Sequence, residues 1–308
     1  MLTAVFSLAG ALVFGAADFL GGLAAKRVSS ILVTAVASLT GFVLLLAALP
    51  FLGGTWLPGD LLWSVLSGVA GAVAISLLYA CLAIGPMSIL SPLTALVSAV
   101  VPMVWGLVVG GERFATLGYW ALGLALVAVV LVGFVPERGA VRPSLRGILM
   151  AIGSGIAIGA FFITIDQTSE QSGVLPLVVN RVVNAVIMFA VLGVLALVGI
   201  IRRRRHDEPR AERMPQRASV GAAVAPVRST TALGVQLAIA CGAVDVVANG
   251  LLLVGIRAGD LSVAAVLGAM YPAGTILLAA LVLEERIAPV QWVGLVLALT
   301  AAGMLAVA

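Results

Sequence analysis

The chain has 308 residues, of which 62% are hydrophobic and 10% are charged, and its mean hydropathy is +1.23. This composition excludes a soluble globular protein, because the chain has far more apolar surface than a soluble core could hide. The formal net charge is +4 at pH 7. The apolar stretches have helical lengths and lack the short alternating pattern of barrel strands, so the sequence predicts an all-α, polytopic membrane protein.

Ten membrane-spanning helices are predicted, since about 20 residues are needed to cross the hydrocarbon core. They lie at residues 3–24, 30–52, 61–84, 87–109, 115–135, 146–167, 174–201, 233–256, 261–283 and 289–307. The remaining segments are too short for a soluble domain. Residues 1–6 contain no basic side chain, so we expect the first span to be retained and not cleaved as a signal peptide.

The first span contains a carboxylate, Asp18, about six residues or 9 Å of helix from its end. An ionised side chain inside the membrane costs about 2.5 to 3.5 kcal/mol on insertion scales, so it needs water or a partner. Asp18 is a candidate substrate-binding residue. The alternative is that it reaches water or pairs with Lys26 near the membrane surface.

Three aromatic residues with a polar group lie within or near the ends of later spans: Tyr79, Trp105 and Tyr271. They are candidates for stacking on a ligand or forming hydrogen bonds with it, and anchoring at the membrane interface is the alternative. Pro272 lacks a backbone N–H, so we expect a kink in the ninth span.

The seventh and eighth spans contain a second group of polar residues: Asn180, Arg181, Asn184, Asp245 and Asn249. Asp245 and Asn249 are four residues apart and share a helical face. In one interpretation, Arg181 and Asp245 form a buried pair that fixes how the two helices pack, with the Asn side chains completing interhelical hydrogen bonds. In the other, Asp245 binds a substrate amine or a proton and Arg181 binds a carboxylate.

Basic residues are concentrated in alternate connections, those after the first, fifth, seventh and ninth spans. The positive-inside rule places these connections in the cytoplasm and both termini outside. The connection at 202–231 contains a run of four arginines and the only histidine, without helical periodicity. It is predicted to be a flexible, basic cytoplasmic loop.

The chain also contains an internal duplication. Residues 78–85, 87–109 and 111–113 are echoed by residues 252–259, 261–283 and 284–286. Residues 1–135 and 146–308 each contain five predicted spans. Because five is an odd number, the two copies are expected to have opposite orientations in the membrane, as in an inverted-topology repeat.

Together with this duplication, several short motifs resemble the EamA family of the drug/metabolite transporter superfamily. They are the sequence FGAADFLGG at 14–22, the Gly-Pro turn at 85–86, and the stretch 272–286 that leads into a last span with a glycine. The resemblance covers nearly the whole chain. It implies a fold of ten helices in two inverted five-helix repeats, and activity as a transporter of small molecules.

The patterns of membrane enzymes are incomplete. Asp18 and Asp245 lack the flanking residues of an intramembrane aspartyl protease, and no His lies in a predicted span, which argues against a Ser-His mechanism and a zinc hydrolase. A Gly-Lys-Ser/Thr phosphate loop is also missing, so no nucleotide hydrolysis is expected. The sequence therefore predicts no enzyme activity, no cofactor and no metal.

The sequence predicts a secondary transporter of a bacterial cytoplasmic membrane that exports a small metabolite, such as an amino acid or an amphipathic compound. One half would rock against the other around a site between the first, third, fourth, sixth, eighth and ninth spans. The expected partners are a small-molecule substrate, membrane lipid and, as the candidate coupling ion, a proton at Asp245. No nucleic-acid partner is expected. The sequence is compatible with either a monomer or a dimer. Uptake of a sugar or nucleotide-type metabolite through Arg181 and a non-transporting sensor or assembly partner are the alternatives.

Overall fold

The structure is a computed structural model that describes residues 1–84, 87–133, 143–206, 227–284 and 287–307. Within these ranges the chain forms eleven α-helices and one short 3-10 helix, and no strand. The prediction of an all-α fold is confirmed.

The helices follow the predicted spans closely. In chain order they are α1 (Leu2–Ala25), α2 (Ser30–Leu52), α3 (Pro58–Ile84), α4 (Met87–Val108), α5 (Thr116–Gly133), α6 (Leu145–Asp166), η1 (Glu170–Ser172), α7 (Leu175–His206), α8 (Val227–Arg257), α9 (Leu261–Gly268), α10 (Tyr271–Val282) and α11 (Pro289–Val307). Nine segments of the described chain are long and apolar enough to cross a membrane, and α4 adds a shorter apolar helix over Pro92–Val108. The chain is a multi-pass membrane protein.

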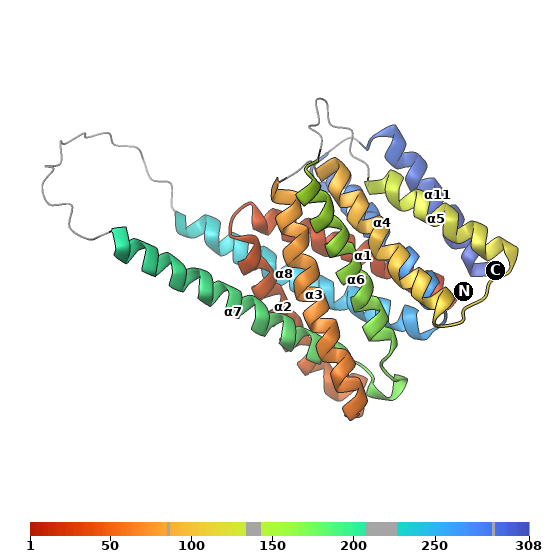
Figure 1. Cartoon of the computed structure of the whole chain (residues 1–308), viewed down its shortest axis with the longest axis horizontal. Coiled ribbons are helices and arrows are strands. Elements are labelled where there is room, and N and C mark those ends of the chain that lie inside the picture. The colour runs from red at the N-terminus through yellow and green to blue at the C-terminus, as the bar shows by residue number, and fades with distance from the viewer. Residues whose placement is uncertain (85–86, 134–142, 207–226, 285–286, 308) are drawn as a thin grey trace, which may run out of the picture.

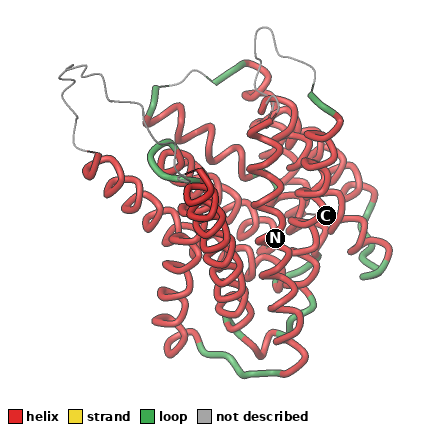
Figure 2. Tube along the Cα trace, turned by 60° about the vertical axis from the view of Figure 1, so that its left-hand side comes forward, coloured by secondary structure: helices red, strands yellow, loops and turns green. Residues whose placement is uncertain are grey.

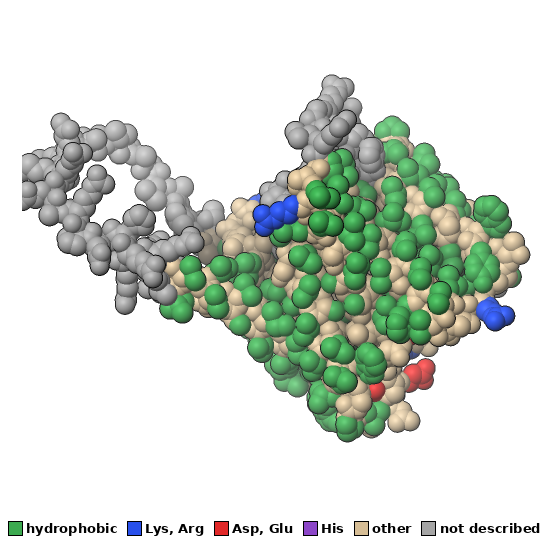
Figure 3. Space-filling model, viewed as in Figure 1, with side chains coloured by type: hydrophobic (Ala, Val, Ile, Leu, Met, Phe, Trp, Pro, Cys, Tyr) green, Lys and Arg blue, Asp and Glu red, His purple; other side chains and the backbone are tan. Residues whose placement is uncertain are grey.

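Large apolar side chains cover the outside of the helix bundle. Trp120, Val186 and Leu299 are 72%, 61% and 66% exposed. Hydrophobic side chains are spread over the whole described face seen in Figure 3, with few charged side chains among them. So much exposed apolar surface would be unfavourable in water. It is the surface expected of helices whose outer faces contact lipid.

The ninth predicted span is not one continuous helix. It divides into α9 and α10, and the last turn of α9 closes with a hydrogen bond from the N–H of Met270 to the carbonyl oxygen of Leu267, 3.1 Å long. Pro272 lies in the first turn of α10. Because proline has no N–H and its ring clashes with the preceding turn, a continuous helix through this point is unfavourable. The kink expected at Pro272 is therefore a break between two helices.

The seventh and eighth helices extend beyond the predicted spans. α7 continues to His206 and α8 begins at Val227, so both ends of the predicted loop 202–231 are helical. Residues 207–226 between them lie outside the described residues. Residues 85–86 and 285–286, which contribute to the resemblance to the EamA family, also lie outside the described residues.

Helices from the two sequence halves interleave in space. α1 packs on α8, α3 on α6, and α5 on α11, and each of these pairs joins the first half to the second. Figure 1 shows α5 and α11 side by side along one edge of the bundle. The two termini lie near each other in both views (Figures 1 and 2). The opposite orientation of the two copies stays a prediction.

Two glycines allow helices to cross in backbone contact. A Cβ atom on Gly15 of α1 would lie 2.3 Å from the carbonyl oxygen of Tyr271, and one on Gly242 of α8 would lie 2.4 Å from that of Ala37. Close crossings at small residues are typical of membrane helices. Asp18 and Asp245 each follow one of these glycines by three residues. The crossings therefore determine where the two carboxylates lie.

Candidate functional site

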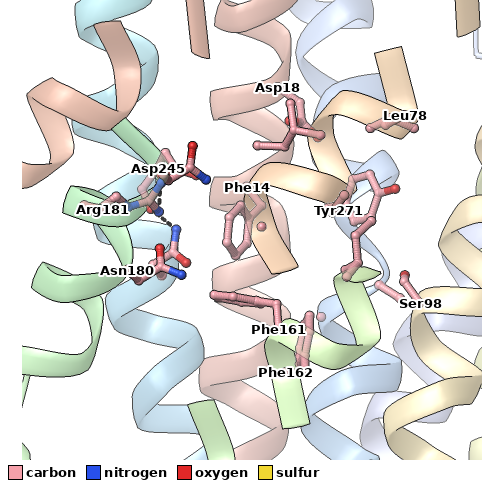
Figure 4. Close-up of a pocket in the computed structure, with 18 residues that line it drawn as sticks. Phe14, Asp18, Leu78, Ser98, Phe161, Phe162, Asn180, Arg181, Asp245 and Tyr271 are labelled. Carbon is pink, nitrogen blue, oxygen red and sulfur yellow. Dashed lines mark hydrogen bonds and ion pairs between the residues drawn. The ribbon is translucent and has the colours of Figure 1, made fainter. Parts of the chain in front are cut away.

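The centre of the bundle contains a cavity of about 190 Å³. Both sequence halves contribute to its wall, through α1, α3 and α4 from the first half and α6 to α10 from the second. The cavity lies among the six spans between which the sequence predicts a site, and α7 lines it as well; its role as the substrate site stays a prediction. Figure 4 shows Arg181 and Asp245 on one side of it and Tyr271 on the other, with Asp18 between them.

Arg181 of α7 and Asp245 of α8 form an ion pair on the cavity wall. An Nη atom of Arg181 lies 2.5 Å from a carboxylate oxygen of Asp245, and the two side chains are 10% and 20% exposed. The amide of Asn249 donates to the backbone carbonyl oxygen of Asp245 at 2.8 Å. The two charges compensate each other in an environment where either alone would be unfavourable.

The Nε atom of Arg181 has a different environment. It is buried and has no hydrogen-bond partner among the described residues. Gly41 of α2 packs beside it, because a Cβ atom built on Gly41 would lie 3.3 Å from Cδ and 3.5 Å from Nε of Arg181. Arg181 is thus enclosed by Asp245 on one side and by α2 on another.

The two asparagines of α7 use their side chains to bind neighbouring helices. Asn180 donates to Ser67 Oγ of α3 at 3.0 Å, and Ser38 Oγ of α2 donates to Asn184 at 3.2 Å. Both asparagines are 3% exposed. They lie on the cavity wall and also connect the two sequence halves through interhelical hydrogen bonds, and substrate binding by them stays a prediction.

Asp18 differs from the other polar residues of the site. It is exposed, it lines the cavity, and in Figure 4 it lies between the ion pair and Tyr271. No hydrogen bond or ion pair involves its carboxylate within the described part of the chain. The alternative that Asp18 pairs with Lys26 is not realised in this structure.

The aromatic wall consists of Phe14, Phe161, Phe162 and Tyr271. The rings of Phe161 and Phe162 are 5.8 Å apart in an edge-to-face arrangement. Sequence reasoning selected Tyr271 but missed the three phenylalanines, because a Phe inside a hydrophobic span does not stand out from its neighbours. The one available signal was the position of Phe14, one helical turn before Asp18.

Two other aromatic candidates are not part of the described cavity wall. Trp105 of α4 is 37% exposed and does not line the cavity, a position that fits the anchoring alternative. The side chain of Tyr79 lies outside the described residues. No group of three His, Cys, Asp or Glu side chains that could hold a metal ion occurs in the part of the chain that the structure describes.

One end of the bundle is held together by hydrogen bonds, most of which join the two sequence halves. Asp60, in the first turn of α3, accepts from the N–H and Oγ of Ser169 at 3.1 and 2.7 Å. Arg257 donates to the carbonyl oxygen of Ser169 at 3.0 Å. Glu112, before α5, accepts from the N–H of Leu261 at 2.7 Å, at the start of α9. A carboxylate at a helix N-terminus is favourable because the first N–H groups of the helix lack partners.

Comparison with known proteins shows the family of the chain. Residues 145–307, from α6 to the end of α11, match the model of the EamA-like transporter family. The chain belongs to the EamA-like transporter family. The prediction of the EamA family within the drug/metabolite transporter superfamily is therefore confirmed. The matched EamA-like region contains Arg181, Asp245 and Tyr271, whereas Asp18 precedes it.

Solved structures support the fold of this EamA-like protein. Among them, 29 chains match. One is a crystal structure described only as that of a protein; it superposes with a TM-score of 0.69 at 16% sequence identity, over 98% of this chain and 95% of the other. At this identity the similarity shows the fold alone. No curated protein matches the chain significantly.

Proposed function

We propose that the protein is a secondary transporter that moves a small amphipathic metabolite across the membrane by alternating access, with the central cavity as its substrate site. The observation that carries this proposal is the cavity itself, whose wall combines charged residues with aromatic residues. Membership of the EamA-like transporter family supports the same conclusion. Transporters commonly bind substrate near mid-membrane, between the two halves of a repeat.

The size of the cavity supports a small substrate. Its volume is about 190 Å³, below the range of about 300 to 1,000 Å³ that is usual for pockets holding drug-sized ligands. A molecule of amino-acid size with an apolar group suits this space. The aromatic rings would contact the apolar part, and the polar residues would contact the rest.

Alternating access requires each end of the cavity to open in turn. The hydrogen bonds of Asp60 and Glu112 join the halves at one end of the bundle. Opening of that end would break them. By the distribution of basic residues, this end faces outside and both termini lie there too, so the arrangement favours a state in which the outer end is closed.

Export from the cytoplasm and coupling to protons complete the proposal. Protonation of Asp245 would link proton and substrate occupancy. It would also leave Arg181 buried without its counter-charge, which is costly. The test is Asp245→Asn in liposomes with an imposed pH gradient: unchanged coupling of flux to the gradient would rule out this role of Asp245.

The identity of the metabolite tests the proposal as a whole. Cells that overexpress the protein should accumulate one small amphipathic compound in the medium, and purified protein in liposomes should transport that compound. A sugar or nucleotide-type compound taken up by the cells would favour the uptake alternative. If amino acids, sugars and cationic drugs all fail to move, a sensor or assembly role becomes the better explanation.

A further inference from the structure

We infer that the cavity accepts a monovalent organic cation with an aromatic or apolar body, and that the cationic group binds at Asp18. This inference rests on the proposed transport function and specifies its substrate class. Four observations on the cavity wall support it. They are the net charge of the lining residues, the lack of a described partner for the Asp18 carboxylate, the contacts that surround the Arg181 guanidinium, and the position of the aromatic rings.

The charge balance of the cavity is negative. Its charged residues are Asp18, Arg181 and Asp245. Arg181 and Asp245 are paired and cancel each other. The carboxylate of Asp18 is left without a described counter-charge, so a ligand with one positive charge makes the site neutral. An isolated charge inside a membrane protein calls for such a partner.

Three other carboxylates in the described bundle, Asp60, Glu112 and Asp166, have hydrogen-bond partners, and Asp18 does not. Asp60 accepts two hydrogen bonds from Ser169, and Glu112 caps the start of α9. At the end of α6, Asp166 accepts from the amide of Gln167 at 3.2 Å. Asp18 is exposed in the cavity and has no such bond within the described ranges. A carboxylate with a purely structural role inside the bundle is expected to have a hydrogen-bond partner or a counter-charge.

The cavity provides no free cation for a substrate carboxylate. One side of the Arg181 guanidinium is occupied by Asp245, and its Nε faces Gly41 of α2. No other Lys or Arg side chain lines the described cavity. A zwitterion or an anion would therefore bring a negative charge that no residue compensates, and the cavity discriminates against both.

The aromatic wall suits the rest of such a cation. Phe14 precedes Asp18 by four residues, so both project from one face of α1. Tyr271 lies across the cavity from the ion pair (Figure 4). Aromatic faces attract cations and also contact apolar groups. A ring that carries a short amine would place its charge at Asp18 and its body between these aromatic side chains.

Three compounds that differ mainly in charge test this inference: 2-phenylethylamine as the cation, phenylalanine as the zwitterion and phenylacetate as the anion. Binding to the purified full chain is measured by calorimetry at neutral pH. We expect the cation to bind at least tenfold more tightly than the other two. Asp18→Asn should weaken its binding by about 10- to 100-fold, the effect of losing a charge-assisted hydrogen bond.

Two variants serve as controls. Asp18→Glu retains the charge and should retain the preference for the cation, which separates loss of charge from loss of folding. Asp260→Asn removes an exposed carboxylate outside the cavity that makes no capping hydrogen bond, and binding should not change.

Several results would overturn the inference. Preference for the zwitterion or the anion would refute the cation class and leave transport standing. Wild-type affinity of Asp18→Asn for the cation would refute the role of Asp18. If none of the three compounds binds, the proposed ligand class fails, and transport is judged separately from the compound that overexpressing cells release.

Discussion

Arg181 and Asp245 depend on each other, since each is the counter-charge of the other inside the bundle. Removing one member of a buried pair typically costs about 3 to 5 kcal/mol, because the remaining charge loses its partner. Removing both charges avoids that penalty. The same pair also lines the cavity, so stability and transport have to be measured separately for each variant.

We expect Asp245→Asn alone to lower the Tm of the protein in detergent, and Arg181→Gln combined with Asp245→Asn to recover part of the loss. The reason is that the double variant leaves no unpaired buried charge. The measurement is thermal unfolding followed by intrinsic fluorescence. A double variant as unstable as Asp245→Asn would contradict mutual stabilisation.

The contacts of some site residues could be predicted from the sequence, and those of others could not. The pairing of Arg181 and Asp245 was one of two interpretations that the sequence allowed, because a charge within a membrane span needs compensation, and the structure shows the pair. The free state of Asp18 was not, since it depends on which helices surround it. Phe161 and Phe162 were missed because hydropathy treats a ring on the cavity wall and a ring facing lipid alike.

At the scale of helices, the crossing of α1 and α10 depends on Gly15. A Cβ there would lie within 2.6 Å of three backbone atoms of α10, whereas one on Gly22 of the same helix would have no neighbour within 4 Å. We expect Gly15→Ala to destabilise the protein by about 1 to 3 kcal/mol, as overpacking does, and Gly22→Ala to leave its stability nearly unchanged.

The measurement is the fraction of monodisperse protein that remains after heating, determined by size-exclusion chromatography. Because Gly22 lies in the same helix, it controls for the change in helix propensity from Gly to Ala. Equal losses in the two variants would show that the backbone contact at Gly15 does not limit stability.

The positions of the helices were easier to predict from the sequence than the point where one of them breaks. The span lengths follow from the thickness of the hydrocarbon core, so hydropathy located them well. The break between α9 and α10 was expected only as a kink at Pro272, because the sequence does not indicate whether neighbouring helices support a full separation. α7 continues to His206 because arginine is a good helix former and no Gly or Pro stops the helix.

At the scale of the whole molecule, the hydrogen bonds of Glu112 join the two sequence halves at one end of the bundle. Glu112→Gln replaces charge-assisted bonds to the start of α9 with weaker ones. We expect this end to open more often. A shift of about 1.4 kcal/mol would raise the open fraction tenfold.

The readout is labelling of Ser98→Cys, on the cavity wall, by a membrane-impermeant maleimide added from outside, in a background without Cys81 and Cys241. The control is Asp260→Asn, at the same end of the bundle and without a capping bond. An unchanged labelling rate in Glu112→Gln would show that these bonds do not hold the end closed.

The orientation of the molecule can be tested independently. Because the basic connections are expected in the cytoplasm, both termini should lie outside. A C-terminal fusion to alkaline phosphatase, which is active only outside the cytoplasm, should be active, and a fusion within residues 207–226 should be inactive. The reverse pattern would invert the membrane orientation and the assignment of the Glu112 end.

The interleaving of the halves has a consequence for biogenesis. The main neighbours of α1, α3 and α5 are α8, α6 and α11, which the ribosome makes later. Ser38 and Ser67 likewise find their asparagine partners only after α7 is inserted. The first five spans therefore enter the membrane before their permanent contacts exist. A fragment that ends before α6 should be degraded when made alone and rescued when α6 to α11 are made alongside it.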